Sequence, residues 1–211
     1  AYIDHPSFGP AVIGRSIEAA GYRIAIVPQP DWHGDFRDFK KLGKPRLFFA
    51  VSPGNMDSMV NKYTANKRLR SEDAYSPDGR HDCRPDYPSI VYTQILKKLF
   101  PDVPVVIGGI EASLRRLTHF DYWQNKLRKS ILCDSGADML LYGVGAKSIL
   151  ALAEAIEQGR NIKKITEIPQ TVYLSSKDNI QGGITDKDII LHSYEECLPV
   201  SYTHLTLPTN R

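Results

Sequence analysis

Short apolar runs alternate along this chain with segments in which apolar residues recur every three or four positions. The runs are typical of buried strands, and the spaced segments are typical of amphipathic helices. We predict strands at residues 23–27, 46–51, 103–107, 137–142, 171–174 and 189–191. We predict helices at residues 8–20, 35–42, 56–60, 89–100, 120–132 and 148–157. This alternation predicts an α/β fold with a doubly wound, mostly parallel sheet.

In such a sheet the loops that follow the strands share one edge, and ligands bind there. Polar or glycine-rich loops are expected at this edge at residues 4–7, 53–55, 108–109 and 143–145. The loop at 108–109 is the most informative, because polar and aromatic residues crowd the segment after it. The candidate ligand or domain contacts are Asp4, His5, Ser7, Gly54, Asn55, Asp57, Gly108, Gly109, Glu111, Ser113, Arg115, Arg116 and His119.

Each candidate also has a structural interpretation. The glycine pair allows close approach of a ligand or of another backbone. Arg115, Arg116 and His119 can bind an anion or contact another domain, or form a solvated helix face with Trp123 packed inward. Glu111 can accept hydrogen bonds from a ligand or cap a helix start.

For the remaining polar candidates we expect a role in helix capping. We expect Asp57 to cap a helix first and to serve a site second, together with Asn55. His5 and Ser7 are expected to hydrogen-bond within their loop and to cap the first helix.

A long segment without periodicity, residues 63–88, carries many charges. Its basic side chains suggest contact with RNA phosphates, but acidic residues interrupt them, and mixed-charge runs are usually solvated. The basic residues are Lys62, Lys67, Arg68, Arg70, Arg80 and Arg84, and the acidic ones include Glu72, Asp73, Asp78 and Asp82.

The composition further limits the class of protein to which this chain belongs. The 211 residues are 42% hydrophobic and 24% charged, which suits a globular protein with a sizeable core. The net charge of +3 does not demand a nucleic-acid partner. Cys83, Cys133 and Cys197 lie far apart, so neither a zinc site nor a disulfide framework is indicated, and a cytoplasmic location fits. No apolar run approaches the length of a membrane span, so no membrane contact is expected.

Both ends of the sequence look non-native. The first residues read as the end of a strand and its loop, so we expect a first strand upstream of residue 1. Residues 200–209 match a translated sequencing adapter, so we interpret residues 200–211 as a non-native tail. The expected organisation is a Rossmann-like domain at residues 1–160 and a connector at residues 161–199.

Three segments resemble one family. DHPSFGPAVIGRSIEAAGYR, GNMDSMVNKYTANKRLRSEDAYSPDG and IGGIEASLRRLTHFDYW are similar to the N-terminal domain of YgiQ-type (UPF0313) radical-SAM proteins. The resemblance implies a flavodoxin-like or cobalamin-binding-like Rossmann domain, followed by a barrel. In that barrel a CxxxCxxC motif holds a [4Fe–4S] cluster, and S-adenosylmethionine binds the cluster and is cleaved to a 5′-deoxyadenosyl radical.

This chain lacks the CxxxCxxC motif. We therefore expect no catalytic residue and no metal ligand within it, and we expect its main partner to be its own downstream barrel. Two alternatives stay open: a cobalamin- or nucleotide-binding module, and an RNA-binding protein acting through residues 62–84. His5 lacks the spacer of the DxHxxG cobalt-ligand motif, so cobalamin ligation is disfavoured.

Overall fold

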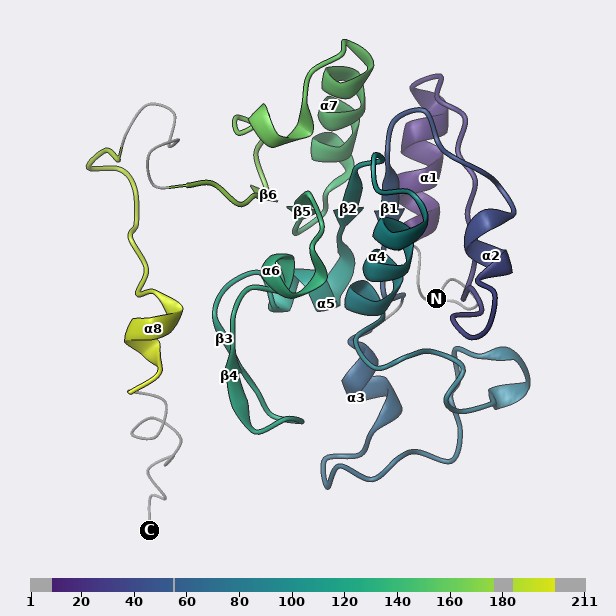
Figure 1. Cartoon of the computed structure of the whole chain (residues 1–211). Helices are drawn as coiled ribbons and strands as arrows, with labels where there is room; N and C mark the ends of the chain where they lie inside the picture. The colour runs from purple at the N-terminus through teal and green to yellow at the C-terminus, as the bar shows by residue number, and fades with distance from the viewer. Residues whose placement is uncertain (1–8, 55, 177–183, 200–211) are drawn as a thin grey trace.

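A four-stranded sheet forms the centre of the computed structural model, which describes residues 9–54, 56–176 and 184–199 (Figure 1). Its strand order is β1-β2-β5-β6. β1, β2 and β5 are parallel, and β6 pairs antiparallel with β5. The strands are β1 (Phe49–Val51), β2 (Val105–Ile107), β5 (Met139–Leu141) and β6 (Thr171–Val172). The prediction of a mixed α/β fold with a mostly parallel sheet is confirmed.

The rest of the described chain consists of helices, 3₁₀ turns, a hairpin and loops. The helices are α1 (Gly9–Ala19), α2 (Arg37–Lys40), α3 (Ser58–Lys62), α4 (Pro88–Leu99), α5 (Gly109–Leu114), α6 (Ile131–Ser135), α7 (Ala146–Glu157) and α8 (Tyr194–Cys197). Two 3₁₀ turns lie at Pro77–Gly79 (η1) and Ile162–Lys164 (η2). The hairpin consists of β3 (His119–Asp121) and β4 (Lys126–Arg128).

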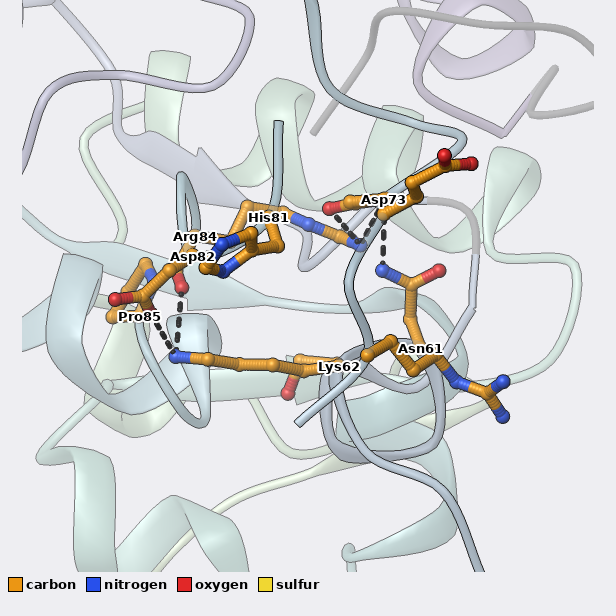
Figure 2. Close-up of a pocket in the computed structure, with 10 residues that line it drawn as sticks. Asn61, Lys62, Asp73, His81, Asp82, Arg84 and Pro85 are labelled. Atoms are coloured by element: carbon orange, nitrogen blue, oxygen red, sulfur yellow. Dashed lines mark hydrogen bonds and ion pairs between the residues drawn. The ribbon is translucent and has the colours of Figure 1, made fainter. Parts of the chain in front are cut away.

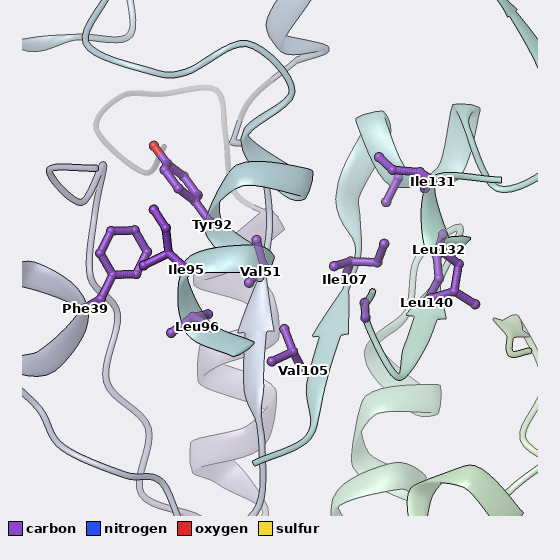
Figure 3. Packing of buried hydrophobic residues seen from close by; sticks show 12 residues of the cluster. Phe39, Val51, Tyr92, Ile95, Leu96, Val105, Ile107, Ile131, Leu132 and Leu140 are labelled. Carbon is purple, nitrogen blue, oxygen red and sulfur yellow. The ribbon is translucent and has the colours of Figure 1, made fainter. Parts of the chain in front are cut away.

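Apolar residues pack on both faces of the sheet. Val105 and Ile107 contact the cluster that includes Tyr92 of α4, as Figure 3 shows. Val106, between them, faces the opposite cluster with α1 and α7, which includes Leu152. This alternation follows from the period of two in a strand. Because β2 is buried on both sides, its sequence is continuously apolar.

The strand predicted at residues 23–27 is wrong. Residues 23–27 form no strand, although their β-branched sequence favours one. Ile24 and Ile26 are 41% and 40% exposed, and their ends lie against Gly14 of α1. β-propensity mostly reflects packing within a sheet. Without a neighbouring strand among the described residues, this segment stays extended coil.

A predicted helix is also wrong. Residues 120–132 form the β3–β4 hairpin and the start of α6, with His119 opposite Arg128 and Phe120 opposite Leu127. Asn125 adopts a φ of 52° in the connecting turn, a conformation that asparagine tolerates better than most residues. Trp123 lies on this turn and is half-buried, so it is not the inward face of a helix.

The two late strand predictions had different outcomes. The 171–174 prediction is confirmed at its first two residues by β6. Residues 189–191 form no strand, and Ile189 and Ile190 are 87% and 75% exposed. An apolar run without a partner surface does not pair into a sheet. This segment leads to α8, which lies away from the sheet in Figure 1.

Several elements lie beyond the edge of the sheet at which the parallel strands have their carboxyl ends. α3, α5, the β3–β4 hairpin and the long 63–87 segment all lie beyond this edge, which is the lower one in Figure 1. The long segment is a loop with two isolated β-bridges, Tyr63 with Leu69 and Glu72 with Arg80. The candidate residues after β1 and β2 therefore lie at one edge, as expected for this topology.

Candidate functional site

Glu111 is a fully buried carboxylate at the centre of this edge. Its side chain is 0% exposed, and its two oxygens accept hydrogen bonds from different helix starts. Ser58 N at the start of α3 donates to Oε2 over 3.2 Å, and Ser89 N at the start of α4 donates to Oε1 over 3.1 Å. The first N–H groups of a helix lack intrahelical partners and favour a negative charge. Glu111 thus joins α5 to the starts of α3 and α4.

Asp57 and Arg115 form a buried ion pair next to Glu111. Asp57 caps α3, because its Oδ1 accepts hydrogen bonds from Met59 N at 3.0 Å and Val60 N at 3.3 Å. The predicted helix cap is confirmed. Its Oδ2 accepts a hydrogen bond from Arg115 Nη1. Burial alone would lower the pKa of Arg115, but the Asp57 carboxylate raises it above its ordinary value.

The hairpin is anchored to the same region through Tyr87. Its hydroxyl donates a 2.6 Å hydrogen bond to Asp121 Oδ2, and the Arg115 guanidinium lies 5.5 Å from its ring centroid. Burial and the Asp121 carboxylate raise the pKa of Tyr87. Burial would raise the pKa of Asp121, but the hydrogen bonds from Tyr87 and from Gln124 N lower it. Asp121 is therefore a buried carboxylate with strong donors.

Arg116, Ser113 and His119 occupy the outer side of the edge. Arg116 donates to the Ser113 carbonyl oxygen over 2.6 Å, and its guanidinium lies 5.0 Å from the centroid of the Tyr142 ring. It forms no ion pair with a carboxylate of the described residues. His119 Nδ1 lies 3.0 Å from the Leu117 carbonyl oxygen. Burial lowers the pKa of His119, which favours the neutral form of the ring.

The chain's own atoms fill the space beside the glycine pair. Gly109 has a φ of 81°, and a Cβ there would lie 2.9 Å from Ser52 Oγ. A Cβ on Gly108 would lie 3.3 Å from the Leu141 carbonyl oxygen. Gly54, with a φ of 105°, is buried in the loop after β1. Gly108 thus admits the backbone of β5, which is one of the two roles predicted for the pair, and Gly109 admits side-chain atoms of the loop after β1.

Some candidates lie outside the part of the chain that the structure describes. They are Asp4, His5, Ser7 and Asn55. The structure therefore gives no geometry for the predicted cap of the first helix or for a cobalt ligand.

A second buried ion pair was not predicted from the sequence. Arg84 Nη2 lies 3.1 Å from Asp73 Oδ2, and Asn61 Nδ2 donates to Asp73 Oδ1 over 2.9 Å (Figure 2). Burial would raise the pKa of Asp73, but its hydrogen bonds and Arg84 lower it. Ser76 Oγ and Tyr75 N also donate to this carboxylate. The pair joins two parts of the 63–87 segment and, through Asn61, links them to α3.

The predicted basic run therefore divides into two groups. Three of its members are paired: Lys62 with Asp82 and Asp86, Arg80 with Asp78, and Arg84 with Asp73. The other three form no ion pair with carboxylates of the described residues, and all three are exposed: Lys67, Arg68 and Arg70. Within this run, the cations without an ion pair thus lie on one short turn.

The described residues do not fit an iron–sulfur cluster, and the hollows among them are too small for a corrin. Within residues 9–54, 56–176 and 184–199, no group of three or more Cys, His, Asp or Glu side chains could hold a metal ion. The hollow in Figure 2 encloses about 10 Å³, room for roughly one water molecule. The cleft between Tyr87 and His119 holds still less. In the same described ranges, no helix is long and apolar enough to cross a membrane.

Comparison with known proteins gives the family. Residues 1–207 match the Radical SAM N-terminal family. A UPF0313 protein of Bacteroides thetaiotaomicron is 61% identical over 94% of this chain, and one of Porphyromonas gingivalis is 62% identical over 94%. One of Pseudomonas aeruginosa is 53% identical over 86%. No solved structure matches this chain.

This chain spans only part of each relative: 33%, 31% and 24% of their respective lengths. The family match nonetheless covers nearly the whole chain, and all three relatives are more than half identical to it. The chain therefore belongs to the UPF0313 family and carries the radical-SAM N-terminal domain of that family.

Proposed function

We propose that this chain is the N-terminal accessory domain of a radical-SAM enzyme, with a Rossmann-like fold related to cobalamin-binding domains. The observation that carries the proposal is the match to the Radical SAM N-terminal family in proteins about three times as long. In the full-length protein, a [4Fe–4S] cluster and S-adenosylmethionine would supply a 5′-deoxyadenosyl radical. The cluster ligands would lie downstream, because the described part of this chain offers no such set.

The accessory role gives the chain a partner, its own downstream barrel. Exposed aliphatic side chains on the connector support this contact: Leu174, Ile184, Ile189, Ile190 and Leu191 are 58% to 87% exposed. Leu114 and Val144, at the carboxyl edge of the sheet, are 61% and 81% exposed. Ile189, Ile190 and Leu191 are consecutive, and contiguous exposed apolar surface is typical of an interface.

The candidate residues at the carboxyl edge of the sheet would have two different roles. Glu111, Asp57 and Arg115 would hold the edge in shape, because their charged groups are satisfied within the chain. Arg116 and His119 lie further out and would contact the barrel or a ligand held between the two domains. None of these residues is assigned a chemical step.

Two experiments on the full-length protein test the proposal. Under anaerobic reduction, the protein should convert S-adenosylmethionine to 5′-deoxyadenosine, and replacing the downstream cluster cysteines by alanine should abolish this. Absence of both a cluster and 5′-deoxyadenosine in the reconstituted protein would contradict the reaction class.

Thermal unfolding of variants tests the proposed contact between the connector and the barrel. Ile189→Asp should lower the melting temperature of the full-length protein, because the barrel would bury the new charge. Leu42→Asp is the matched control, since Leu42 is also exposed, at 59%, but lies on the α2 side of the domain. Equal melting temperatures for the two variants would contradict docking at the connector.

A further inference from the structure

The tip of the β3–β4 hairpin lies against the turn at residues 64–70. Tyr122 OH donates to the Ala65 carbonyl oxygen over 2.7 Å, and Lys67 Nζ donates to the Trp123 carbonyl oxygen over 3.3 Å. The rings of Tyr63 and Trp123 have centroids 5.6 Å apart. Two segments more than fifty residues apart in sequence thus form one surface, which we call the hairpin–turn surface.

Aromatic rings and cations both lie on the two segments that form the hairpin–turn surface. Tyr122 is 52% exposed, and its ring lies 4.6 Å from Lys67 Nζ and 5.3 Å from the Trp123 ring. Arg68 on the turn and Lys126 on β4 are exposed as well. Among the described residues, no carboxylate pairs with Lys67, Arg68 or Lys126. The positive charge here is therefore not neutralised internally, in contrast to that of Lys62, Arg80 and Arg84.

The ring of Tyr122 is also held in place. Its hydroxyl is hydrogen-bonded to the turn, and its neighbour Trp123 packs nearly perpendicular to it, at 78°. Lys67, which contacts both residues, has a φ of 58°, uncommon for a residue with a side chain. Because the ring is already held in one orientation, stacking of a planar ligand on it costs little conformational entropy.

We propose that the hairpin–turn surface binds single-stranded nucleic acid. Lys67, Arg68 and Lys126 would neutralise backbone phosphates, and an unstacked base would lie on the Tyr122 ring. Exposed aromatic rings beside unpaired cations are the features that bind single strands with little sequence preference. The inference does not depend on the radical chemistry, because every contact it uses lies within this chain.

The test measures binding of a fluorescein-labelled 12-mer, as mixed-sequence RNA and as the same DNA, to the full-length protein by fluorescence anisotropy. Binding at low salt that weakens as salt rises is expected. Replacing Lys67, Arg68 and Lys126 together by glutamine should reduce the slope of log affinity against log salt by about 2, since each phosphate contact on a single strand contributes about 0.7. The ratio of RNA to DNA affinity identifies which nucleic acid the surface prefers.

Two control experiments distinguish binding at this surface from nonspecific attraction of nucleic acid to positive charge. A second triple variant replaces Lys44, Lys163 and Lys164 by glutamine; these residues are equally exposed and form no ion pair within the described ranges, but lie toward the other edge of the sheet. It should retain the salt slope. Tyr122→Phe keeps the ring but loses the hydrogen bond to the Ala65 carbonyl oxygen, so it should bind slightly more weakly than the parent. Tyr122→Ala should bind roughly tenfold more weakly than Tyr122→Phe, in the range found for base stacking.

Some results would overturn the proposal. It fails if neither oligonucleotide binds at low salt, which would indicate that the barrel covers this surface. It also fails if the control triple variant loses as much affinity as the first, or if Tyr122→Ala binds as tightly as Tyr122→Phe. The first triple variant alters exposed side chains and loses the exposed hydrogen bond from Lys67 Nζ to the Trp123 carbonyl oxygen, so its melting temperature should fall only slightly below that of the parent.

Discussion

Glu111 should be the most sensitive position at the carboxyl edge of the sheet. Its buried carboxylate accepts one hydrogen bond from each of two helix starts, at Ser58 N and Ser89 N. Glu111→Gln keeps the size of the side chain but replaces one acceptor oxygen by an NH₂ group, which would face an N–H donor. A hydrogen bond to a charged group contributes about 1.5–3 kcal/mol, and a buried donor left without a partner costs about 1–3 kcal/mol.

The expected loss is about 2–4 kcal/mol at the two helix starts. Hydrogen–deuterium exchange with mass spectrometry on the full-length protein measures it directly. In peptides that cover residues 57–62 and 87–93, exchange of protected amides should accelerate roughly 30-fold or more, because each 1.4 kcal/mol corresponds to a factor of ten. Peptides from α7, on the opposite face of the sheet, should change less.

Ser89→Ala is the matched control. It leaves the backbone N–H that bonds Glu111 in place and removes only a buried hydroxyl, for which the described residues provide no hydrogen-bond partner. Its exchange should stay near that of the parent. The reasoning is refuted if Glu111→Gln leaves both peptides unchanged, or if Ser89→Ala accelerates exchange as much.

Three further predictions concern stability, each measured by thermal unfolding of the full-length protein. Gly109→Ala should be more destabilising than Gly159→Ala, because both have positive φ but only the first adds a Cβ 2.9 Å from the preceding loop; equal losses would contradict the close packing. Tyr87→Phe should cost about 1.5–3 kcal/mol by removing the hydrogen bond to the Asp121 carboxylate, and a neutral result would contradict that bond. The lowered pKa of Asp73 stabilises the fold above pH 4, and this contribution is lost as the pH falls through the folded-state pKa. Asp73→Asn should therefore lower stability at pH 7 and weaken its acid dependence below pH 4, and an unchanged acid dependence would contradict this assignment.

Sequence patterns predicted the parts of this fold that repeat regularly. The apolar runs at β1, β2 and β5 and the periodicity of α4 and α7 led to correct elements, because burial on two faces leaves a strong pattern. The hairpin was predicted as a helix, since the few apolar residues in the segment fit either period. Strand pairing and packing on the 64–70 turn favour the hairpin over a helix. The packing involves residues more than fifty positions away, so the local sequence pattern does not reveal it.

The candidate site was predictable in position but not in its contacts. Polar residues after β1 and β2 were expected at one edge, and the structure places Asp57, Glu111 and Arg115 together there. Tyr87 and Asp121 were not among the candidates, although Asp121 lies in the polar segment that drew attention to this edge. The buried pair of Asp73 and Arg84 was interpreted as solvated charge, because an isolated carboxylate in a mixed-charge run gives no signal of burial.

The central claim is that this chain is an accessory domain and does not hold the iron–sulfur cluster. Iron and sulfide analysis of the full-length protein, with electron paramagnetic resonance of the reduced form, tests it most directly when Cys83, Cys133 and Cys197 are all replaced by serine. The account predicts the iron content and spectrum of one [4Fe–4S] cluster in both the parent and the triple variant. Loss of the cluster in the variant, or no cluster in the parent, would contradict it.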